Sequence, residues 1–373
     1  MIRGENNSLY LNFFNIFILG CEIMFKIILK RNLLSIVGVF VCCYLLFLMP
    51  YAVSNGITNG LEICFRTILP SLFPFMVLSS YIIKTDAFSS VYRILSPLTR
   101  FLFRQPDCAV SVIVMGLIGG FPVGAKMTAM LYENGRISKN EAQRLCMFCV
   151  NGGPAFIITA IGVGMFSSNR AGVIMFVSLC ASSIIIGIIS RFFGDESRSE
   201  SNHKSNNQSP LLALSSSVSD NVNSILSICA WIILFSALTE CLKEMKFNDN
   251  IYTALVSVLE VTKGCSYIAV KMPIEIVTCI IGFGGFCVHC QVYSFVRSTG
   301  LKYIRFFTGR VINGALSAVI CHLLLMVFPV DLETSLQNVS GIVPFSVSLP
   351  AFISVFVMCI IMIFDIDSKR KVC

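Results

Sequence analysis

Residues 116–154, GLIGGFPVGAKMTAMLYENGRISKNEAQRLCMFCVNGGP, decide how the rest of the chain is interpreted. Small and helix-breaking residues interrupt the apolar run at Gly119, Gly120, Pro122 and Gly124. Lys126 follows the interruption, and a second break, Asn-Gly-Gly-Pro, stands at 151–154. Backbone groups freed by a break find no partner in lipid, so a broken helix in an apolar chain faces protein or a water-filled cavity. The segment therefore predicts the lining of a cavity.

The same pattern returns in the second half of the chain. Residues 284–291, GGFCVHCQ, resemble residues 119–126, GGFPVGAK, and an Asn-Gly pair follows each of them, at 151–152 and 313–314. Broken segments at corresponding positions of two halves are the sequence feature that best indicates a transporter site. We therefore expect two related halves, with chance similarity between glycine-rich membrane sequences as the alternative.

The composition indicates an integral membrane protein. Of the 373 residues, 55% are hydrophobic and only 13% are charged, which is untypical of a water-soluble domain. The lipid bilayer is therefore the expected partner. The net charge of +8 comes from basic residues scattered over short loops, so no nucleic-acid partner is expected.

The 17 cysteines fall mostly inside apolar runs, where cysteine behaves as a small hydrophobic residue. Two Cys-x-x-Cys pairs, at 146–149 and 287–290, are the alternative to be weighed, because four thiolates hold zinc. Both pairs lie in membrane-type sequence without the polar residues of a zinc turn. We expect reduced thiols, no metal and no cofactor.

The chain is expected to have four regions: an N-terminal extension at 1–32, a first transmembrane half at 33–192, a polar linker at 193–215 and a second transmembrane half at 216–373. The extension either forms an interfacial helix or lies upstream of a true start at Met24. The first half is expected to hold a span at 33–50, an interrupted span at 55–84, an amphipathic connection at 85–107, a hairpin at 108–130, a polar loop at 132–144, and spans at 145–166 and 171–189. The second half is expected to hold an interrupted span at 218–241, a connection at 242–271, a hairpin at 273–296, and spans at 311–328 and 342–364.

This plan predicts an all-α, polytopic membrane protein with two inverted repeats, each made of an interrupted helix, a re-entrant hairpin and two spans. The repeats are inverted because each half crosses the membrane an odd number of times. Basic residues at 297–305 and 369–371 then lie on the outer side, against the positive-inside rule. Parallel halves, with hairpins that cross the membrane, are the alternative.

The residues expected to bind substrate lie at or beside the breaks: Gly119, Gly120, Phe121, Pro122, Gly124, Lys126, Asn151, Gly152, Gly153, Gly284, Gly285, His289, Gln291 and Asn313. Lys126 is the main candidate, because an ammonium group at membrane depth needs an anion or an interface. Hairpin helix N-termini would add N–H groups for the same anion.

Each polar candidate also has a structural interpretation. Asn151 and Asn313 either bind substrate through their amides or satisfy freed backbone groups. His289 either titrates or bonds across helices. Glu62 and Arg66, spaced i,i+4, form either a structural ion pair or part of a coupling path, and Glu260 is a further coupling candidate.

No catalytic constellation is present in the sequence. The segment 119–126 lacks the spacing of a Walker loop, and neither Gly-x-Ser-x-Gly nor His-Glu-x-x-His occurs. The chain is therefore not expected to be an enzyme or to drive transport with ATP.

The segments GGFPVGAK, LYENGRISKNEAQRL and NGGPAFI resemble the sporulation integral membrane proteins of the YlbJ type, whose Gate domain is similar to parts of concentrative nucleoside transporters and of ferrous-iron transporters. The resemblance implies a protein of a spore-forming bacterium, in the cell membrane or the outer forespore membrane, that moves dipicolinic acid. A small planar dianion fits the cation and amides named above. The alternatives are a nucleoside or nucleobase transporter, and a membrane scaffold for spore-envelope assembly that transports nothing.

Overall fold

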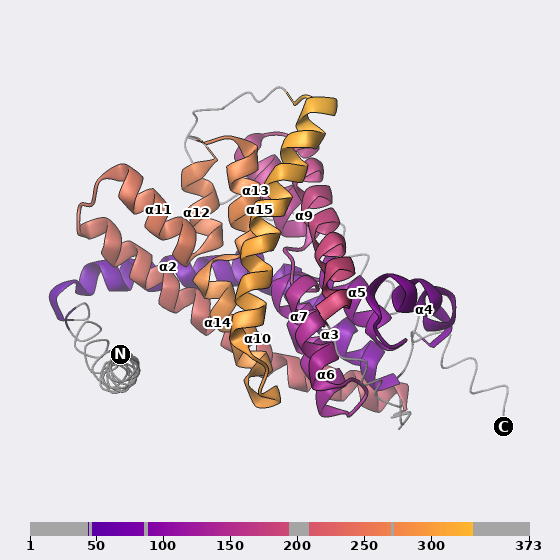
Figure 1. The fold of residues 1–373 in the computed structure, drawn as a ribbon. Coiled ribbons are helices and arrows are strands. Elements are labelled where there is room, and N and C mark those ends of the chain that lie inside the picture. The colour runs from indigo at the N-terminus through magenta and orange to yellow at the C-terminus, as the bar shows by residue number, and fades with distance from the viewer. Residues whose placement is uncertain (1–43, 45–46, 86–88, 194–208, 270–271, 331–373) are drawn as a thin grey trace, which may run out of the picture. The chain divides into compact units, whose positions relative to one another are not determined.

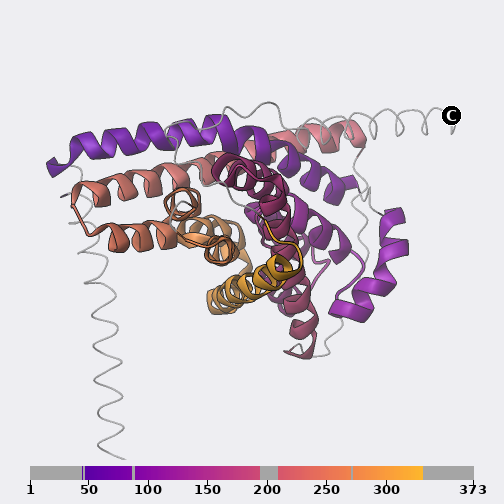
Figure 2. The same cartoon turned by 90° about the horizontal axis from the view of Figure 1, so that it is seen from above.

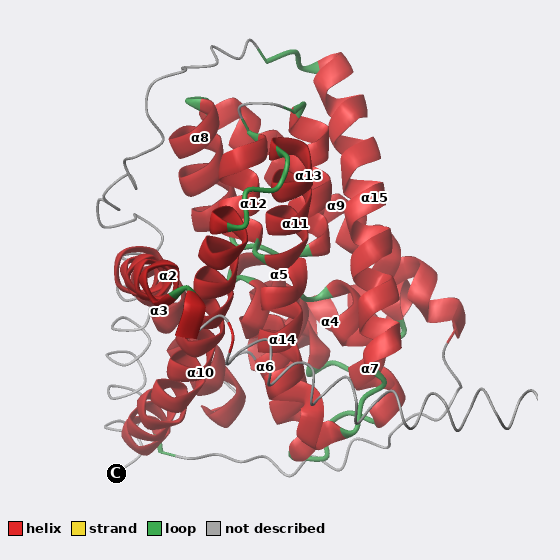
Figure 3. Ribbon diagram, turned by 90° about the vertical axis from the view of Figure 1, so that its left-hand side faces the viewer, coloured by secondary structure: helices red, strands yellow, loops and turns green. Residues whose placement is uncertain are grey.

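The computed structural model describes residues 44, 47–85, 89–193, 209–269 and 272–330. Every regular element in these ranges is a helix (Figure 3). The chain divides into two compact units, Met1–Asn55 and Gly56–Cys373. All contacts reported below lie in the second unit. The predicted extension at 1–32, most of the first predicted span, the span at 342–364 and the basic tail lie outside the described residues.

Five helical segments are long and apolar enough to cross a bilayer: Pro50–Thr85, Asn169–Phe193, Pro210–Glu244, Ile274–Val296 and Tyr303–Val327. Each exceeds the roughly 20 residues that a membrane span requires. The first consists of α2 (Pro50–Ile63), a π-helical turn η1 (Cys64–Ile68) and α3 (Leu69–Thr85). The protein is therefore a polytopic, all-helical membrane protein. The helix α4 (Ser89–Phe103) occupies the predicted amphipathic connection.

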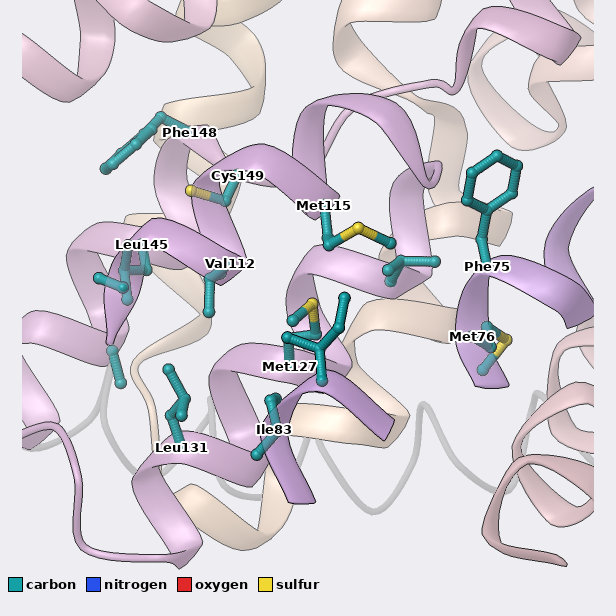
Figure 4. Packing of buried hydrophobic residues seen from close by; sticks show 14 of the residues in the cluster. Phe75, Met76, Ile83, Val112, Met115, Met127, Leu131, Leu145, Phe148 and Cys149 are labelled. Atoms are coloured by element: carbon teal, nitrogen blue, oxygen red, sulfur yellow. The ribbon is translucent and has the colours of Figure 1, made fainter. Parts of the chain in front are cut away.

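The helices α5 (Ala109–Ile118) and α6 (Phe121–Glu133) fold back on each other at Gly119-Gly120. Gly120 has φ +97°, a backbone conformation that L side chains rarely adopt. At the base of the pair, the Cys108 thiol lies 3.6 Å from the carbonyl oxygen of Arg136. The two helices thus form an antiparallel helical hairpin whose tip is the glycine pair. Side chains from both helices enter one apolar cluster with Cys149 and Phe148 (Figure 4).

The next segment is a broken helix. The helix α7 (Lys139–Phe148) ends before residues 149–154, and η2 (Ala155–Val163) and α8 (Gly164–Phe166) continue after them. It runs antiparallel to α9 (Asn169–Ser190), since Phe148 lies against Gly187 at one end and Gly162 against Gly172 at the other. The short 3-10 helix η3 (Arg191–Phe193) follows α9. The polar loop predicted at 132–144 is wrong, because Ser138 and Glu141 form a capping box that starts α7 inside it.

The helix α10 (Pro210–Glu244) is continuous, so the interruption predicted within 218–241 is wrong. It begins at a proline suited to a first helical turn, five residues before the predicted end of the linker. Its polar first half stays helical because the side chains bond to neighbours. The Asn221 amide, for example, donates to the Ser217 carbonyl and to the Ser80 hydroxyl.

A second helical hairpin lies within residues 242–271, where the sequence predicts only a connection. The helices α11 (Asp249–Leu259) and α12 (Val261–Ile268) fold back at Glu260. A Cβ added at Gly264 would lie 2.4 Å from the Cα of Ser257, so the two backbones are in close contact. The rings of Tyr252 and Tyr267 meet edge to face near the base.

The hairpin predicted at 273–296 is instead a bent helix. The helices α13 (Ile274–Phe283) and α14 (Gly285–Val296) follow each other end to end, and both run antiparallel to α15 (Tyr303–Val327) (Figures 1 and 2). Successive contacts show the direction: Thr278 meets Cys321, Gly282 meets Gly314, and His289 meets Tyr303. Positive φ at Gly284 and Gly285 bends the helix without reversing it. The 3-10 helix η4 (Arg297–Thr299) separates α14 from α15.

Candidate functional site

Four interruptions of helical structure meet in the second unit. They are the tips of the two hairpins and the breaks of the two bent helices. A Cβ added at Gly153 would lie 3.3 Å from the Gly120 nitrogen, which brings the α7–η2 break against the α5–α6 tip. A Cβ at Gly284 would touch the Phe121 ring at 3.5 Å, and one at Gly285 would lie 3.2 Å from the Val261 nitrogen. The second break therefore contacts both tips.

Arg310, on α15, lies at the centre of this arrangement and is fully buried. Its guanidinium donates to the carbonyl oxygens of Val150 and Gly282, and at 3.4 Å to that of Phe283. A further bond of 3.4 Å goes to the Asn151 side-chain oxygen. Within the described ranges, no carboxylate lies at ion-pair distance from Arg310.

These acceptors explain why a cation is stable here. The Val150 carbonyl belongs to the break that follows α7, and the Gly282 and Phe283 carbonyls end α13. The last carbonyls of a helix lack intrahelical partners and carry partial negative charge. Arg310 satisfies both helix ends at once. His289 adds a ring-nitrogen bond of 3.0 Å to the Phe283 carbonyl.

Two asparagines and a serine form a closed set of hydrogen bonds beside Arg310. The Asn313 amide donates to the Asn151 side-chain oxygen at 3.1 Å, and the Asn151 amide donates to the Ser183 hydroxyl at 2.6 Å. The Ser183 hydroxyl lies 3.4 Å from the Asn313 side-chain oxygen. All three residues are fully buried. The asparagines predicted from the sequence are thus direct partners, and they hold the α7–η2 break against α9 and α15.

Three of the helices that begin at the interruptions have no side-chain cap: α6, η2 and α14. The fourth, α12, is capped by the buried carboxylate of Glu260, which accepts from the backbone nitrogens of Thr262 at 3.0 Å and Lys263 at 2.6 Å. Free N–H groups at a helix N-terminus favour a bound anion. Phe121, the first residue of α6, places its ring 5.6 Å from the Arg310 guanidinium carbon.

His289 bonds across helices, in agreement with its structural interpretation. One ring nitrogen lies 2.8 Å from the Tyr303 hydroxyl and the other 3.0 Å from the Phe283 carbonyl. Because a carbonyl only accepts, the nitrogen facing Phe283 carries the proton, and a neutral ring then accepts from Tyr303. Aromatic rings of Phe283, Phe286, Phe306 and Phe307 surround the imidazole.

The structure places several predicted residues away from the four interruptions. The Lys126 ammonium bonds to α10, at 2.6 Å to Asn221 and 2.7 Å to Ser224. The Gln291 amide lies 3.3 Å from the Cys287 sulfur on its own helix. Glu62 and Arg66 form an ion pair of 3.1 Å.

The predicted glycines lie at or near the interruptions. Gly119, Gly120, Gly152, Gly153, Gly284 and Gly285 line the interruptions, Pro122 lies in the first turn of α6, and Gly124 lies against the Cys149 carbonyl. Among the described side chains, no group of three His, Cys, Asp or Glu residues is placed to hold a metal ion.

Sequence reasoning missed Arg310. It ends the segment YIRFFTGR at 303–310 and directly precedes the span predicted at 311–328, so it looks like a charge at the border of that span. The spacing of two residues in the sequence does indicate this site, because Arg310 and Asn313 are three residues apart and share a face of one helix. A cation and an amide on the same face of a span indicate a polar site inside the protein.

The comparisons with known proteins agree with this organisation. Residues 65–196 match the Gate family, described as nucleoside recognition, and this region contains the first hairpin and the first broken helix. The chain is 27% identical over 342 residues to the sporulation integral membrane protein YlbJ of Bacillus subtilis (strain 168), covering 79% of this chain and 84% of that protein. No solved structure matches. This chain is an integral membrane protein that carries a Gate nucleoside-recognition region and is a distant homologue of the sporulation protein YlbJ.

Proposed function

We propose that this protein is a transporter that carries a small organic anion through the point where the two hairpin tips and the two helix breaks meet. The observation that carries the proposal is Arg310, a fully buried cation without a carboxylate partner in the described ranges, which donates to carbonyl oxygens at both helix breaks and lies against Phe121, the first residue of α6. A buried charge without a counter-ion is costly in a membrane and marks substrate or ion pathways. We assign the main anion contact to Arg310 in place of Lys126, whose hydrogen bonds are made with α10.

Dipicolinic acid is the substrate we propose, moved across the outer forespore membrane. The homology to a sporulation membrane protein supports a role in sporulation. Dipicolinate is a planar dianion with a ring nitrogen. Arg310 would bind one carboxylate as a planar fork, and the N–H groups of α6 and α14 would bind the other. Asn151 and Asn313 offer amide groups beside them for the ring nitrogen.

We further propose that two inverted repeats form this site. They consist of other helices than those expected from the sequence. The first is hairpin α5–α6, broken helix α7–η2 and span α9, and the second is hairpin α11–α12, broken helix α13–α14 and span α15. With α10 crossing between them, three crossings separate the two hairpins, so the hairpins would enter from opposite sides. Re-entrant hairpins on opposite sides would bring their tips together, and the contacts of Gly120 and Val261 with the two breaks support this arrangement. Substrate would pass when one hairpin opens at a time.

The proposal is tested by ligand binding to purified, detergent-solubilised protein, measured as thermal stabilisation. Dipicolinate is expected to raise the melting temperature, because a ligand that binds only the folded state stabilises it. The variant Arg310→Gln should remove this shift, whereas Lys126→Ala should keep it. A dipicolinate shift that survives in Arg310→Gln would refute the assignment of Arg310.

A nucleoside is the second candidate substrate, favoured by the description of the matching family. Uridine in the same assay separates the two classes. A shift with uridine alone, insensitive to Arg310→Gln, would assign the site to a neutral ligand bound through Asn151 and Asn313. No shift with either ligand, and normal dipicolinate content in spores of a deletion strain, would favour the envelope scaffold.

A further inference from the structure

Lys126 connects the first hairpin to α10. From α6, its ammonium group donates at 2.6 Å to the Asn221 side-chain oxygen, at 2.7 Å to the Ser224 hydroxyl and at 3.4 Å to the Asp220 carbonyl. Only 8% of Lys126 is exposed. Its hydrogen bonds tie the second arm of the α5–α6 hairpin to the first half of α10.

Lys263 makes the equivalent connection for the second hairpin. From α12, its ammonium group donates at 3.3 Å to the Ser236 carbonyl, at 3.1 Å to the Thr239 hydroxyl and at 3.5 Å to the Glu240 carboxylate. The acceptors again lie within one turn of α10. Each lysine thus extends from the second arm of a hairpin, just beyond its tip, and bonds to one backbone carbonyl and two side chains of the same helix.

The two attachment points are well separated along α10. From Asp220 to Ser236 the helix rises about 24 Å. The α10 helix is continuous over this distance. A rigid helix that holds both hairpins at separate points can release one without moving the other. Neither lysine contacts Arg310 or the asparagines of the central site, so their role differs from that of a substrate contact.

We infer that α10 is a common anchor and that Lys126 and Lys263 are separate latches, one for each hairpin. Breaking the Lys126 contacts frees the α5–α6 tip, and breaking the Lys263 contacts frees the α11–α12 tip. In the transport function proposed above, each release opens the central site from one side. The inference rests on that function only for this last step, because the latches themselves are a property of the hairpins in the absence of substrate.

Lys84 is a matched control. Its ammonium group also bonds to α10, at 2.8 Å to the Ser216 hydroxyl and at 2.6 Å to the Asp220 carboxylate. It comes from α3, however, and its hydrogen bonds contact neither hairpin. Removing Lys84 therefore removes a comparable lysine contact to the same helix without touching either tip.

The test is hydrogen–deuterium exchange of the full chain in lipid nanodiscs, without substrate, for Lys126→Met, Lys263→Met and Lys84→Met. Loss of a charge-assisted hydrogen bond should speed local opening by about tenfold or more. We expect faster exchange at residues 119–123 in Lys126→Met alone and at residues 259–264 in Lys263→Met alone, with neither tip altered in Lys84→Met. The conservative variants Lys126→Arg and Lys263→Arg, which keep the charge, should retain slow exchange.

Several results would overturn the inference. Unchanged exchange at both tips, or equal acceleration throughout the protein, would show that the lysines do not hold the hairpins individually. If a lysine variant does not fold, Ser224→Ala and Thr239→Val remove acceptors on α10 instead and should give the same tip-specific pattern. Tip-specific exchange together with absent dipicolinate binding would support the latches and reject the proposed substrate, so the two failures are distinguishable.

Discussion

Replacing Gly124 by alanine should separate the first hairpin from the broken helix α7–η2. A Cβ built on Gly124 would lie 1.8 Å from the carbonyl oxygen of Cys149 and 2.9 Å from its carbonyl carbon. Favourable contacts between heavy atoms begin near 3.5 Å, so the two segments must move apart by about 1.7 Å. The atom that the new methyl group would overlap is a backbone oxygen, so no side-chain rotation relieves the overlap. Gly116 on α5 lies against the same carbonyl.

The magnitude follows from two opposing effects. Inside a helix, alanine is more stabilising than glycine by about 0.5–1 kcal/mol of folding free energy. Overpacking of this kind costs about 1–3 kcal/mol or more, and here the displaced atom is a backbone carbonyl next to Val150. We therefore expect a net loss of roughly 2 kcal/mol and, for a chain of 373 residues, a melting temperature lower by roughly 3 °C. Dipicolinate binding should weaken by at least about tenfold, because the Val150 carbonyl that orients Arg310 moves with its neighbour.

Gly135→Ala is the control for the change in residue type. Gly135 has φ +67°, but no atom lies within 4 Å of its added Cβ. Alanine there should cost about 1 kcal/mol of backbone strain and leave binding intact. The assay is thermal unfolding in detergent with and without dipicolinate. A Gly124→Ala protein as stable as the unsubstituted chain, with an unchanged ligand shift, would refute the contact between hairpin and break.

Three further changes test single contacts. Glu260→Ala removes the cap of α12 and should lower stability by about 1 kcal/mol in thermal unfolding; an unchanged melting temperature would contradict the capping role. His289→Leu removes the hydrogen-bond partner of the Tyr303 hydroxyl and should lower the free energy of unfolding by about 1 kcal/mol in the same assay; an unchanged melting temperature would show that this bond does not stabilise the fold. Trp231, the single tryptophan of the chain, donates to Ser294 at 2.9 Å, so Ser294→Ala should shift its fluorescence to shorter wavelength, and identical spectra would show that this bond is absent in solution.

The sequence predicted where the first hairpin turns and where the first helix breaks, because both depend on local chemistry. Gly119-Gly120 supplies a positive φ, and Asn151-Gly152-Gly153-Pro154 cannot continue a helix. Composition alone was sufficient to identify a membrane protein. These features need no knowledge of what packs against the segment, so they are visible in the chain itself.

The second half was predicted less well because a break does not specify the direction in which the chain leaves it. Gly284-Gly285 looks like Gly119-Gly120 in sequence, yet it bends a helix that continues along α15. The actual second turn lies at Glu260, where a carboxylate cap takes the place of a glycine pair. Bonds from Arg310 and His289 to the carbonyls before Gly284 hold the bend, and those partners are distant in sequence.

The balance of charge at the site explains why Arg310 stays buried without a carboxylate. Each helix terminus carries about half an elementary charge. The ends of α7 and α13 at the two breaks together supply about −1 beside the guanidinium, which they compensate. At each hairpin tip one helix ends where the next begins, so the termini of α5 and α6 offset each other, as do those of α11 and α12. The N-termini of η2 and α14, together about +1, then stand against the carboxylate of Glu260, and the site is close to neutral in total. The anion that we propose as substrate would therefore be held by hydrogen bonds from Arg310 and nearby N–H groups, and Arg310→Gln would leave a net charge of about −1 that disfavours it.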